Sequence, residues 1–155
     1  MNETLRALHE LKMNTVLIWP NMDAGSDGIS KAIRVFREQE NPQYMHFFKS
    51  LPIEYYAPLL KNAACIVGNS SSGIREAAFL GTPAVNIGTR QNGRERGCNV
   101  LDVAYDRGEI LHAVEKQMGH GPYPPDYIYG DGTACKKIVD ILGKVQFRIQ
   151  KRIRY

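Results

Sequence analysis

The segment at residues 68–76, Gly-Asn-Ser-Ser-Ser-Gly-Ile-Arg-Glu, has the residue types of an anion site. It directly follows an apolar run and opens a pattern typical of an amphipathic helix. Small residues leave the amides of a first helical turn uncovered, and the helix dipole favours negative charge there. The hydroxyls of Ser70 and Ser71 can bond phosphate oxygens, and Glu76 lies about one turn further along, within reach of a ribose diol. A serine N-cap followed by a solvent-facing glutamate fits this segment equally well.

A second segment, Gly-Thr-Arg-Gln-Asn-Gly-Arg-Glu-Arg-Gly at residues 88–97, also directly follows an apolar run. Its three arginines could clamp a pyrophosphate through bidentate hydrogen bonds. Arg90 is nearest to the preceding run and is the candidate. A solvated, charged loop is the better interpretation for Arg94 and Arg96.

A third segment, Pro-Asn-Met-Asp-Ala-Gly-Ser at residues 20–26, places Asn21 and Asp23 after a short apolar run. Short polar side chains at such a position can contact the hydroxyls of a ligand. Taken alone, the segment is better explained as a turn followed by a helix cap, because Asp, Gly and Ser are the residues that both require.

The histidines and cysteines, residue types that can hold metals or act as nucleophiles, are scattered along the chain. No two histidines are four residues apart and none has a cysteine neighbour, so we expect no metal site and no bound cofactor. No nucleophile has an evident base. Three widely spaced cysteines exclude a full disulfide framework and favour a reducing cytoplasm. These residues are His9, His46, His112, His120, Cys65, Cys98 and Cys135.

Helical and strand-like patterns alternate along the chain, which predicts an α/β fold with a Rossmann-like parallel sheet flanked by helices. Such sheets bind ligands beyond the carboxyl ends of their strands, where all three polar segments would lie. Because a helix comes first, the domain is expected to lack its first strand. The predicted helices are 4–12, 27–39, 53–62, 71–80, 109–118 and 133–142, and the predicted strands are 15–19, 44–48, 65–67, 84–87 and 99–103.

A chain of 155 residues is long enough for one domain, which we place at residues 1–143. No apolar run is long enough for a membrane span, and the charged N-terminus is not a signal peptide. Residues 144–155 form a basic tail with five basic and no acidic residues, leaving 15 basic and 16 acidic residues elsewhere. The nearly neutral body has no aromatic-basic interleaving, so we expect neither a nucleic acid nor a membrane as partner.

Four blocks in this order resemble UDP-N-acetylglucosamine 2-epimerases. They are Pro-Asn-x-Asp-Ala-Gly-Ser, Gly-Asn-Ser-Ser-x-Gly-x-Arg-Glu, Gly-Thr-Pro-x-x-Asn-x-Gly-Thr-Arg-Gln-x-Gly-Arg-Glu and Tyr-Gly-Asp-Gly. The likeness is strongest to the hydrolysing branch, which makes N-acetylmannosamine and UDP for sialic-acid-type sugars. It implies the C-terminal half of a glycosyltransferase-B-like two-domain architecture.

The resemblance also implies roles for individual residues. Ser70 and Ser71 would bind the UDP phosphates and Glu76 the ribose hydroxyls. Asn21, Asp23 and Arg90 would lie around the nucleotide and its diphosphate. The turn at 51–52, with Tyr55 or Tyr56, would hold the uracil, although core packing explains these tyrosines equally well. Lys31, Arg34 and Arg37 correspond to a regulatory region of related animal enzymes, but a solvated helix face is the better interpretation.

The family's catalytic carboxylates come from an N-terminal domain that these 155 residues do not match. A histidine used near the sugar phosphate lies on the opening strand of the C-terminal domain, which would precede Met1. We therefore expect no catalytic residue in this chain and no activity from it alone. The expected function is UDP or UDP-N-acetylglucosamine binding within such an enzyme. The alternative is a non-catalytic nucleotide-sugar binding or regulatory module.

The basic tail is predicted to self-associate. Its odd-numbered positions from 145 to 155 are apolar except for Lys151, which suits a strand, whereas Val145, Ile149 and Ile153 also suit a helix. An apolar edge of this kind needs a partner, so we expect a homo-oligomer in the absence of an N-terminal domain.

Overall fold

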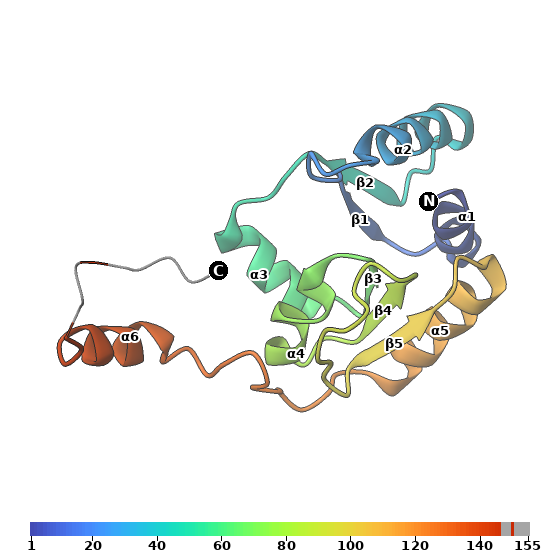
Figure 1. Ribbon diagram of the computed structural model, residues 1–155. Coiled ribbons are helices and arrows are strands. Elements are labelled where there is room, and N and C mark those ends of the chain that lie inside the picture. Colours follow the sequence, from blue (N-terminus) through green and yellow to red (C-terminus); the bar gives the residue numbers. More distant parts are fainter. Residues whose placement is uncertain (147–149, 151–155) are drawn as a thin grey trace.

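The computed structural model describes residues 1–146 and residue 150, and its helices and strands are shown in Figure 1. They alternate in the order that the hydrophobic pattern predicts. The helices are α1 (Asn2–Leu11), α2 (Ser26–Glu40), α3 (Ile53–Asn62), α4 (Glu76–Leu80), α5 (Arg107–His120) and α6 (Ala134–Leu142). The strands are β1 (Thr15–Ile18), β2 (Met45–Phe48), β3 (Ile66–Gly68), β4 (Ala84–Ile87) and β5 (Val100–Val103).

The five strands pair in parallel, as predicted, but they form two sheets rather than one. In the first sheet β1 pairs with β2, with Thr15 opposite Met45. In the second sheet β4 lies between β3 and β5, and Ala84 is opposite both Ile66 and Val100. The edges that face each other are those of β1 and β3 (Figure 1).

Helix α1 holds the two sheets together because it belongs to both hydrophobic cores. Ala7 packs with Val85 of β4 and with α5, whereas Leu5 packs with Leu17 of β1 and Ile33 of α2. Leu5 and Ala7 are fully buried. Burying a side chain such as Leu5 contributes about 2 kcal/mol, so α1 is a substantial link between the sheets.

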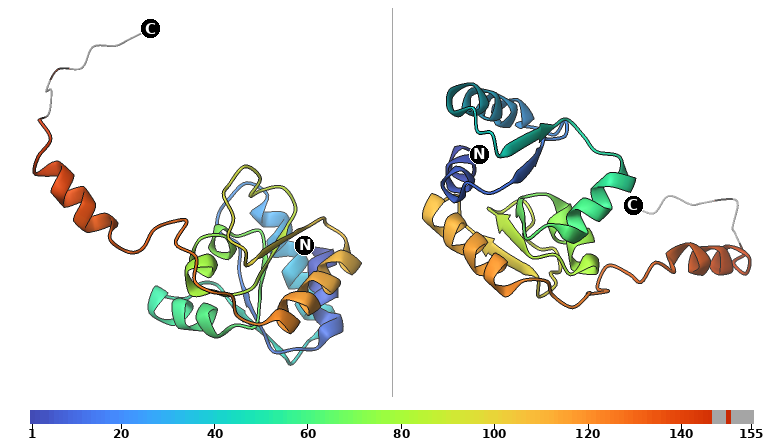
Figure 2. Two further views of the ribbon diagram at one scale, coloured as in Figure 1. Left: turned by 90° about the horizontal axis from the view of Figure 1, so that it is seen from below. Right: turned by 180° about the vertical axis from the view of Figure 1, so that it is seen from behind.

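The helices cover the strands in two groups. Helix α1 contacts α5 and α2, and α3 contacts α4. Along β4, Val85 belongs to the core with α5, while a Cβ on Gly73 would meet the Cβ of Ala84 at 3.7 Å. Alternate residues of a strand point to opposite faces, so α1 and α5 lie on one face of this sheet, and α3 and α4 lie on the other (Figure 2).

The single helix predicted over residues 71–80 is interrupted. A 3₁₀ turn, η1 (Ser71–Gly73), precedes the five-residue α4. The Gly73 N–H donates to the carbonyl of Ser70 at 3.2 Å, which is the i to i+3 spacing of a 3₁₀ turn. Serine and glycine favour such turns over an α-helix, because serine bonds nearby backbone and glycine has the greatest backbone freedom.

Helix α6 extends away from the rest of the chain (Figure 2). None of its residues is buried, and Ile138, Val139 and Ile141 are each more than half exposed. No helix among the described residues is long and apolar enough to cross a membrane. Residues 147–149 and 151–155 lie outside the described part, so the conformation and self-association expected for the basic tail remain predictions.

Burial of Cys65, which directly precedes β3, predicts a difference in reactivity among the three cysteines. Burial raises the pKa of the Cys65 thiol to about 12, whereas Cys98 and Cys135 are exposed. Since the thiolate is the reactive form, native protein at pH 8 is expected to give two fast-reacting thiols and one slow one. Counting the labelled thiols with a chromogenic disulfide, before and after urea unfolding, checks this.

The same burial sets a pH dependence. The pKa of the Cys65 thiol is about 12 in the folded protein, against an ordinary value of 9.0. Between pH 9 and pH 12 the unfolded chain loses this proton while the folded protein keeps it, so the free energy of unfolding falls as the pH rises. The free energy of unfolding should therefore decrease across that window, and the decrease should be smaller in a Cys65→Ala variant. Equal labelling of all three cysteines in native protein would contradict the burial on which both expectations rest.

Candidate functional site

Loops that follow β1, β3 and β4 line one cavity of about 1160 Å³. Four of the six residues expected to bind UDP line it, namely Asn21, Asp23, Ser70 and Arg90. They come from three segments that are far apart in the sequence. The structure therefore gathers them beyond the carboxyl ends of the strands, where parallel α/β sheets bind ligands.

Arg90 joins these loops through its guanidinium group. It donates to a carboxylate oxygen of Asp23 at 2.8 Å and to the carbonyl of Asn69 at 3.2 Å. The side chains of Arg90 and Asp23 are at least half exposed, so this ion pair contributes about 1 kcal/mol or less. An incoming phosphate could therefore take the place of the Asp23 carboxylate on Arg90 and gain a bidentate contact.

The serine turn after β3 is fixed by hydrogen bonds of its own. The Ser70 hydroxyl oxygen accepts from the Ser72 N–H at 3.3 Å, and the Tyr56 hydroxyl donates to the Ser72 hydroxyl oxygen at 2.7 Å. Ser70 is thus an N-cap, as one of the two sequence interpretations had it, but its exposed side chain also borders the cavity. The interrupted helix weakens the dipole argument for an anion here, because η1 spans a single turn.

The other two expected residues do not reach the cavity wall. Ser71 is partly buried, and Glu76 is an exposed residue at the start of α4. Of the two tyrosines considered for the uracil, Tyr56 borders the cavity together with Leu51, whereas Tyr55 does not and is 70% exposed.

Gln91 supports the site and was not expected from the sequence. Its side chain is only 2% exposed, and its Nε2 donates to the carbonyl of Asn69 at 2.7 Å. The carbonyl of Asn69 thereby receives bonds from both Arg90 and Gln91, which ties the loop after β4 to the turn after β3. Gln91 differs from its polar neighbours in the sequence only by being buried, so nothing in the sequence pattern indicated its supporting role.

Arg96 has a structural partner. Its Nε lies 2.7 Å from a carboxylate oxygen of Asp102, whose other oxygen accepts from the buried Asn86 at 2.6 Å. Arg94 is exposed. Neither arginine borders the cavity, which agrees with the preference for Arg90.

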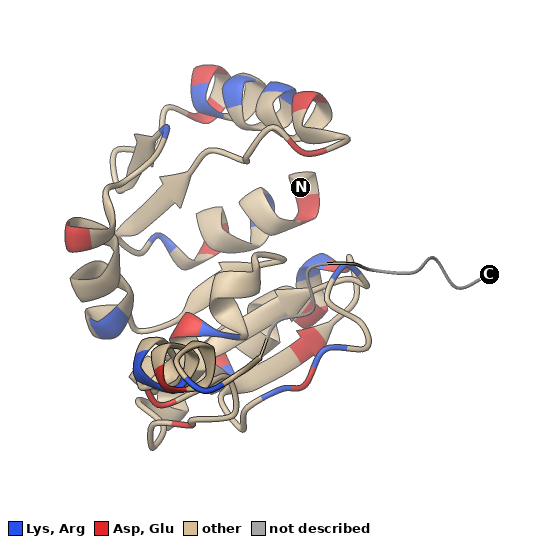
Figure 3. Ribbon diagram, turned by 60° about the vertical axis from the view of Figure 1, so that its left-hand side comes forward, with Lys and Arg blue, Asp and Glu red and all other residues tan. Residues whose placement is uncertain are grey.

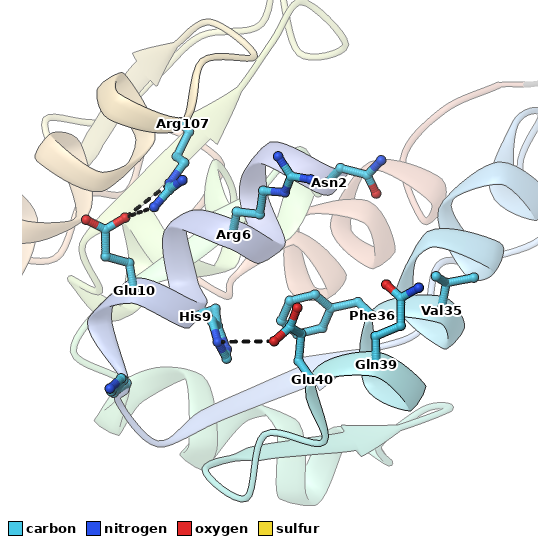
Figure 4. Close-up of a pocket in the computed structure, with 10 residues that line it drawn as sticks. Asn2, Arg6, His9, Glu10, Val35, Phe36, Gln39, Glu40 and Arg107 are labelled. Carbon is cyan, nitrogen blue, oxygen red and sulfur yellow. Dashed lines mark hydrogen bonds and ion pairs between the residues drawn. The ribbon is translucent and has the colours of Figure 1, made fainter.

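A second cavity of about 600 Å³ lies between α1 and α2 and contains none of the six expected residues. Figure 4 shows two ion pairs at its border, Arg107 with Glu10 and His9 with Glu40. Among the described residues, no three His, Cys, Asp or Glu side chains are grouped to hold a metal ion.

The charged stripe on α2 lies on an exposed face. Lys31, Arg34 and Arg37 are exposed, and the Arg37 guanidinium lies 5.8 Å from the centroid of the Phe47 ring. In Figure 3, basic and acidic residues are mixed along α2 at the top of the view. This is the mixed surface expected of a solvated helix face.

Comparisons with known proteins place this arrangement in a family. The sequence model of UDP-N-acetylglucosamine 2-epimerase matches residues 1–143. The chain is 30% identical over 140 residues to the UDP-N-acetylglucosamine 2-epimerase of Neisseria meningitidis, covering 88% of this chain and 36% of that protein. It is 34% identical over 117 residues to the polysialic acid biosynthesis protein P7 of Escherichia coli, covering 74% and 29%.

A third relative is the GDP/UDP-N,N'-diacetylbacillosamine 2-epimerase (hydrolyzing) of Campylobacter jejuni. It is 39% identical over 100 residues, which are 63% of this chain and 26% of that protein. The chain spans about a third of the length of the curated relatives it matches. With the parallel α/β fold and the family match over residues 1–143, the chain belongs to the UDP-N-acetylglucosamine 2-epimerase family.

Proposed function

We propose that this chain is the UDP-binding C-terminal portion of a hydrolysing UDP-N-acetylglucosamine 2-epimerase, an enzyme that gives N-acetylmannosamine and UDP. The observation that carries the proposal is the convergence of Asn21, Asp23, Ser70 and Arg90 on one cavity. The Campylobacter jejuni relative, whose name includes the word hydrolyzing, supports the choice of branch.

The proposed binding mode assigns the diphosphate to Arg90 and to the serine turn. Arg90 is held at the cavity by Asp23 and Asn69, so little side-chain freedom is lost when it binds a phosphate. Ser70 supplies a hydroxyl group at the cavity. Ser71 and Glu76, which do not line the cavity, are kept as the candidates for a phosphate and for the ribose. Leu51 and Tyr56 border the part of the cavity assigned to uracil.

On this proposal, the catalytic residues belong to polypeptide outside these 155 residues. Residues 1–143 would form the nucleotide-binding domain, and residues 144–155 a basic tail. The catalytic groups would then come from an N-terminal domain within the remaining two thirds of the relatives' length. On this proposal, purified chain binds UDP but does not turn over UDP-N-acetylglucosamine.

Calorimetric titration of UDP into the purified chain tests the proposal. Saturable binding is expected, and Arg90→Ala should raise the Kd about tenfold, the equivalent of about 1.4 kcal/mol from a lost phosphate contact. Arg94→Ala is the matched control, because it removes the same charge from the same loop away from the cavity, and it should change the Kd less than twofold.

Two further variants locate the binding surface. Ser71→Ala and Glu76→Ala should each weaken binding about threefold or more if the serine turn and the start of α4 take part, the size of one modest hydrogen bond. The absence of saturable binding at millimolar UDP would contradict the proposal, as would equal weakening by Arg90→Ala and Arg94→Ala.

A further inference from the structure

Tyr105 borders the same cavity as Arg90 and was not expected from the sequence. It follows the last residue of β5, Val103, by two positions and lines the cavity of about 1160 Å³. Its side chain is 61% exposed. Since parallel α/β sheets bind ligands beyond the carboxyl ends of their strands, Tyr105 lies where a side chain can contact a ligand.

The ring of Tyr105 lies directly against Gly88, the first residue of the loop that carries Arg90. A Cβ placed on Gly88 would overlap the phenol end of this ring, so the ring has its position only because residue 88 is a glycine. The Gly88 N–H donates to the carbonyl of Val103 at 2.8 Å. Tyr105 and the loop after β4 are therefore held next to each other.

The backbone on both sides of Tyr105 is fixed by the first turn of α5. The Asp106 carboxylate accepts from the Glu109 N–H at 2.9 Å, and the Glu109 carboxylate accepts from the Ala104 N–H at 3.0 Å. This reciprocal pattern resembles a capping box. An exposed ring on a fixed backbone loses little freedom when it binds a ligand, which favours a binding role.

Tyr105 lies at the opposite end of the strands from Leu51. Leu51 follows β2, and Figure 1 shows β2 and β5 on the two outer sides, with β1, β3 and β4 between them. Arg90 reaches Asp23 after β1 and Asn69 after β3, so its guanidinium lies toward the middle. Neighbouring strands are about 4.8 Å apart, so the ends of β3 and β5 are about 10 Å apart.

This order matches the order of groups in a nucleotide sugar, which are the base, the ribose, the diphosphate and the sugar. In the proposed binding mode the uracil lies near Leu51 and Tyr56, and the diphosphate lies at Arg90. The group that follows the diphosphate would then extend toward β5. Tyr105 borders the cavity on that side.

We propose that Tyr105 contacts the sugar of a bound UDP-sugar and so distinguishes it from UDP. This inference rests on the function proposed above and adds a sugar contact to it. The phenol group suits a sugar, because its ring packs against the C–H groups of a pyranose and its hydroxyl bonds a sugar hydroxyl or amide.

Calorimetric titration of the purified chain with UDP and with UDP-N-acetylglucosamine tests the inference. Tyr105→Ala should raise the Kd for UDP-N-acetylglucosamine about fivefold or more and change the Kd for UDP less than twofold. Tyr105→Phe keeps the ring and removes the hydroxyl, so it should raise the first Kd by a smaller factor, about threefold.

Tyr127→Ala is the matched control. Tyr127 has a similar exposure of 57% but does not line the cavity. Its replacement should change neither Kd by more than twofold. Circular dichroism of each variant shows that the fold is kept, as expected for exposed side chains.

Saturation-transfer NMR gives a second measurement that does not depend on affinity alone. Irradiating the aromatic protons of the native chain should saturate the sugar protons of bound UDP-N-acetylglucosamine. In Tyr105→Ala the sugar signal should fall relative to the uracil signal about twofold or more, whereas Tyr127→Ala should leave this ratio unchanged.

Two outcomes would overturn the inference and leave the proposed function intact. One is equal weakening of UDP and UDP-N-acetylglucosamine by Tyr105→Ala, which would place the ring against the nucleotide. The other is an unchanged Kd for UDP-N-acetylglucosamine together with an unchanged ratio of sugar to uracil signals. Absence of UDP binding to the native chain would instead contradict the proposed function, and this inference with it.

Discussion

Replacing Gln117 with leucine is expected to lower the free energy of unfolding by about 3 kcal/mol. Gln117 lies in α5 with no exposed surface, and its Nε2 donates to the carbonyls of Ala84 and Asn99 at 2.8 and 2.7 Å. Its Oε1 accepts from the Tyr123 hydroxyl at 2.7 Å. Leucine has a similar volume but removes all three bonds and leaves the Tyr123 hydroxyl without this acceptor.

Urea unfolding followed by circular dichroism measures this effect. Gln39→Leu is the matched control, because Gln39 is exposed on α2, and its unfolding free energy should change by about 0.5 kcal/mol or less. A Gln117→Leu protein as stable as Gln39→Leu would show that the three bonds contribute nothing net. Gln117→Glu should also destabilise, because a carboxylate cannot donate to the two carbonyls.

Gly81→Ala is expected to destabilise the fold by about 3 kcal/mol or more. Gly81 ends α4 with φ of 72°, a left-handed conformation that disfavours other residues by about 1 kcal/mol. A Cβ at this position would lie 2.1 Å from the carbonyl oxygen of Tyr123. That atom is backbone, and the Tyr123 N–H donates to the Gly81 carbonyl at 2.8 Å, so relieving the clash would disturb this bond.

The Gly25→Ala variant separates the cost of the left-handed backbone from the cost of the clash with Tyr123. Gly25 has φ of 84° and ψ of 0°, close to the values at Gly81, but nothing lies within 4 Å of a Cβ placed there. It should therefore destabilise by only about 1 kcal/mol. Thermal unfolding of the two variants side by side checks the difference, and equal melting temperatures would mean that Tyr123 moves aside at no cost.

Much of the fold was predictable because local pattern and tertiary structure agree. The β-rich runs that become β1 and β4 are short and end at turn residues, so their type and limits are visible in the sequence. Residues 71–80 were harder. The apolar residues Ile74, Ala77 and Ala78 have helical spacing, but the Ser-Ser-Gly run that precedes them forms a 3₁₀ turn held by Ser70 and by the hydroxyl of Tyr56.

Part of the candidate site was predictable from the order of the predicted strands and loops. Position after a strand made Arg90 a candidate, since chain order alone determines which loops follow the carboxyl ends. Asn21 and Asp23 became candidates only through the family resemblance, because their segment alone is explained as a turn and a helix cap. It could not show that Glu76 would be exposed away from the cavity, because that depends on where the interrupted helix resumes. It could not reveal Gln91 either, whose role depends on burial against Asn69.

The link that α1 makes between the two cores has a consequence for local unfolding. A two-stranded sheet is marginally stable alone, so β1, α2 and β2 depend on Leu5 of α1 for much of their protection. The amides of this part should exchange through smaller openings than those of β4 and α5. Asn21 and Asp23 belong to the part that opens first, and Ser70 and Arg90 to the part that persists. A ligand that spans both would convert two cooperative units into one.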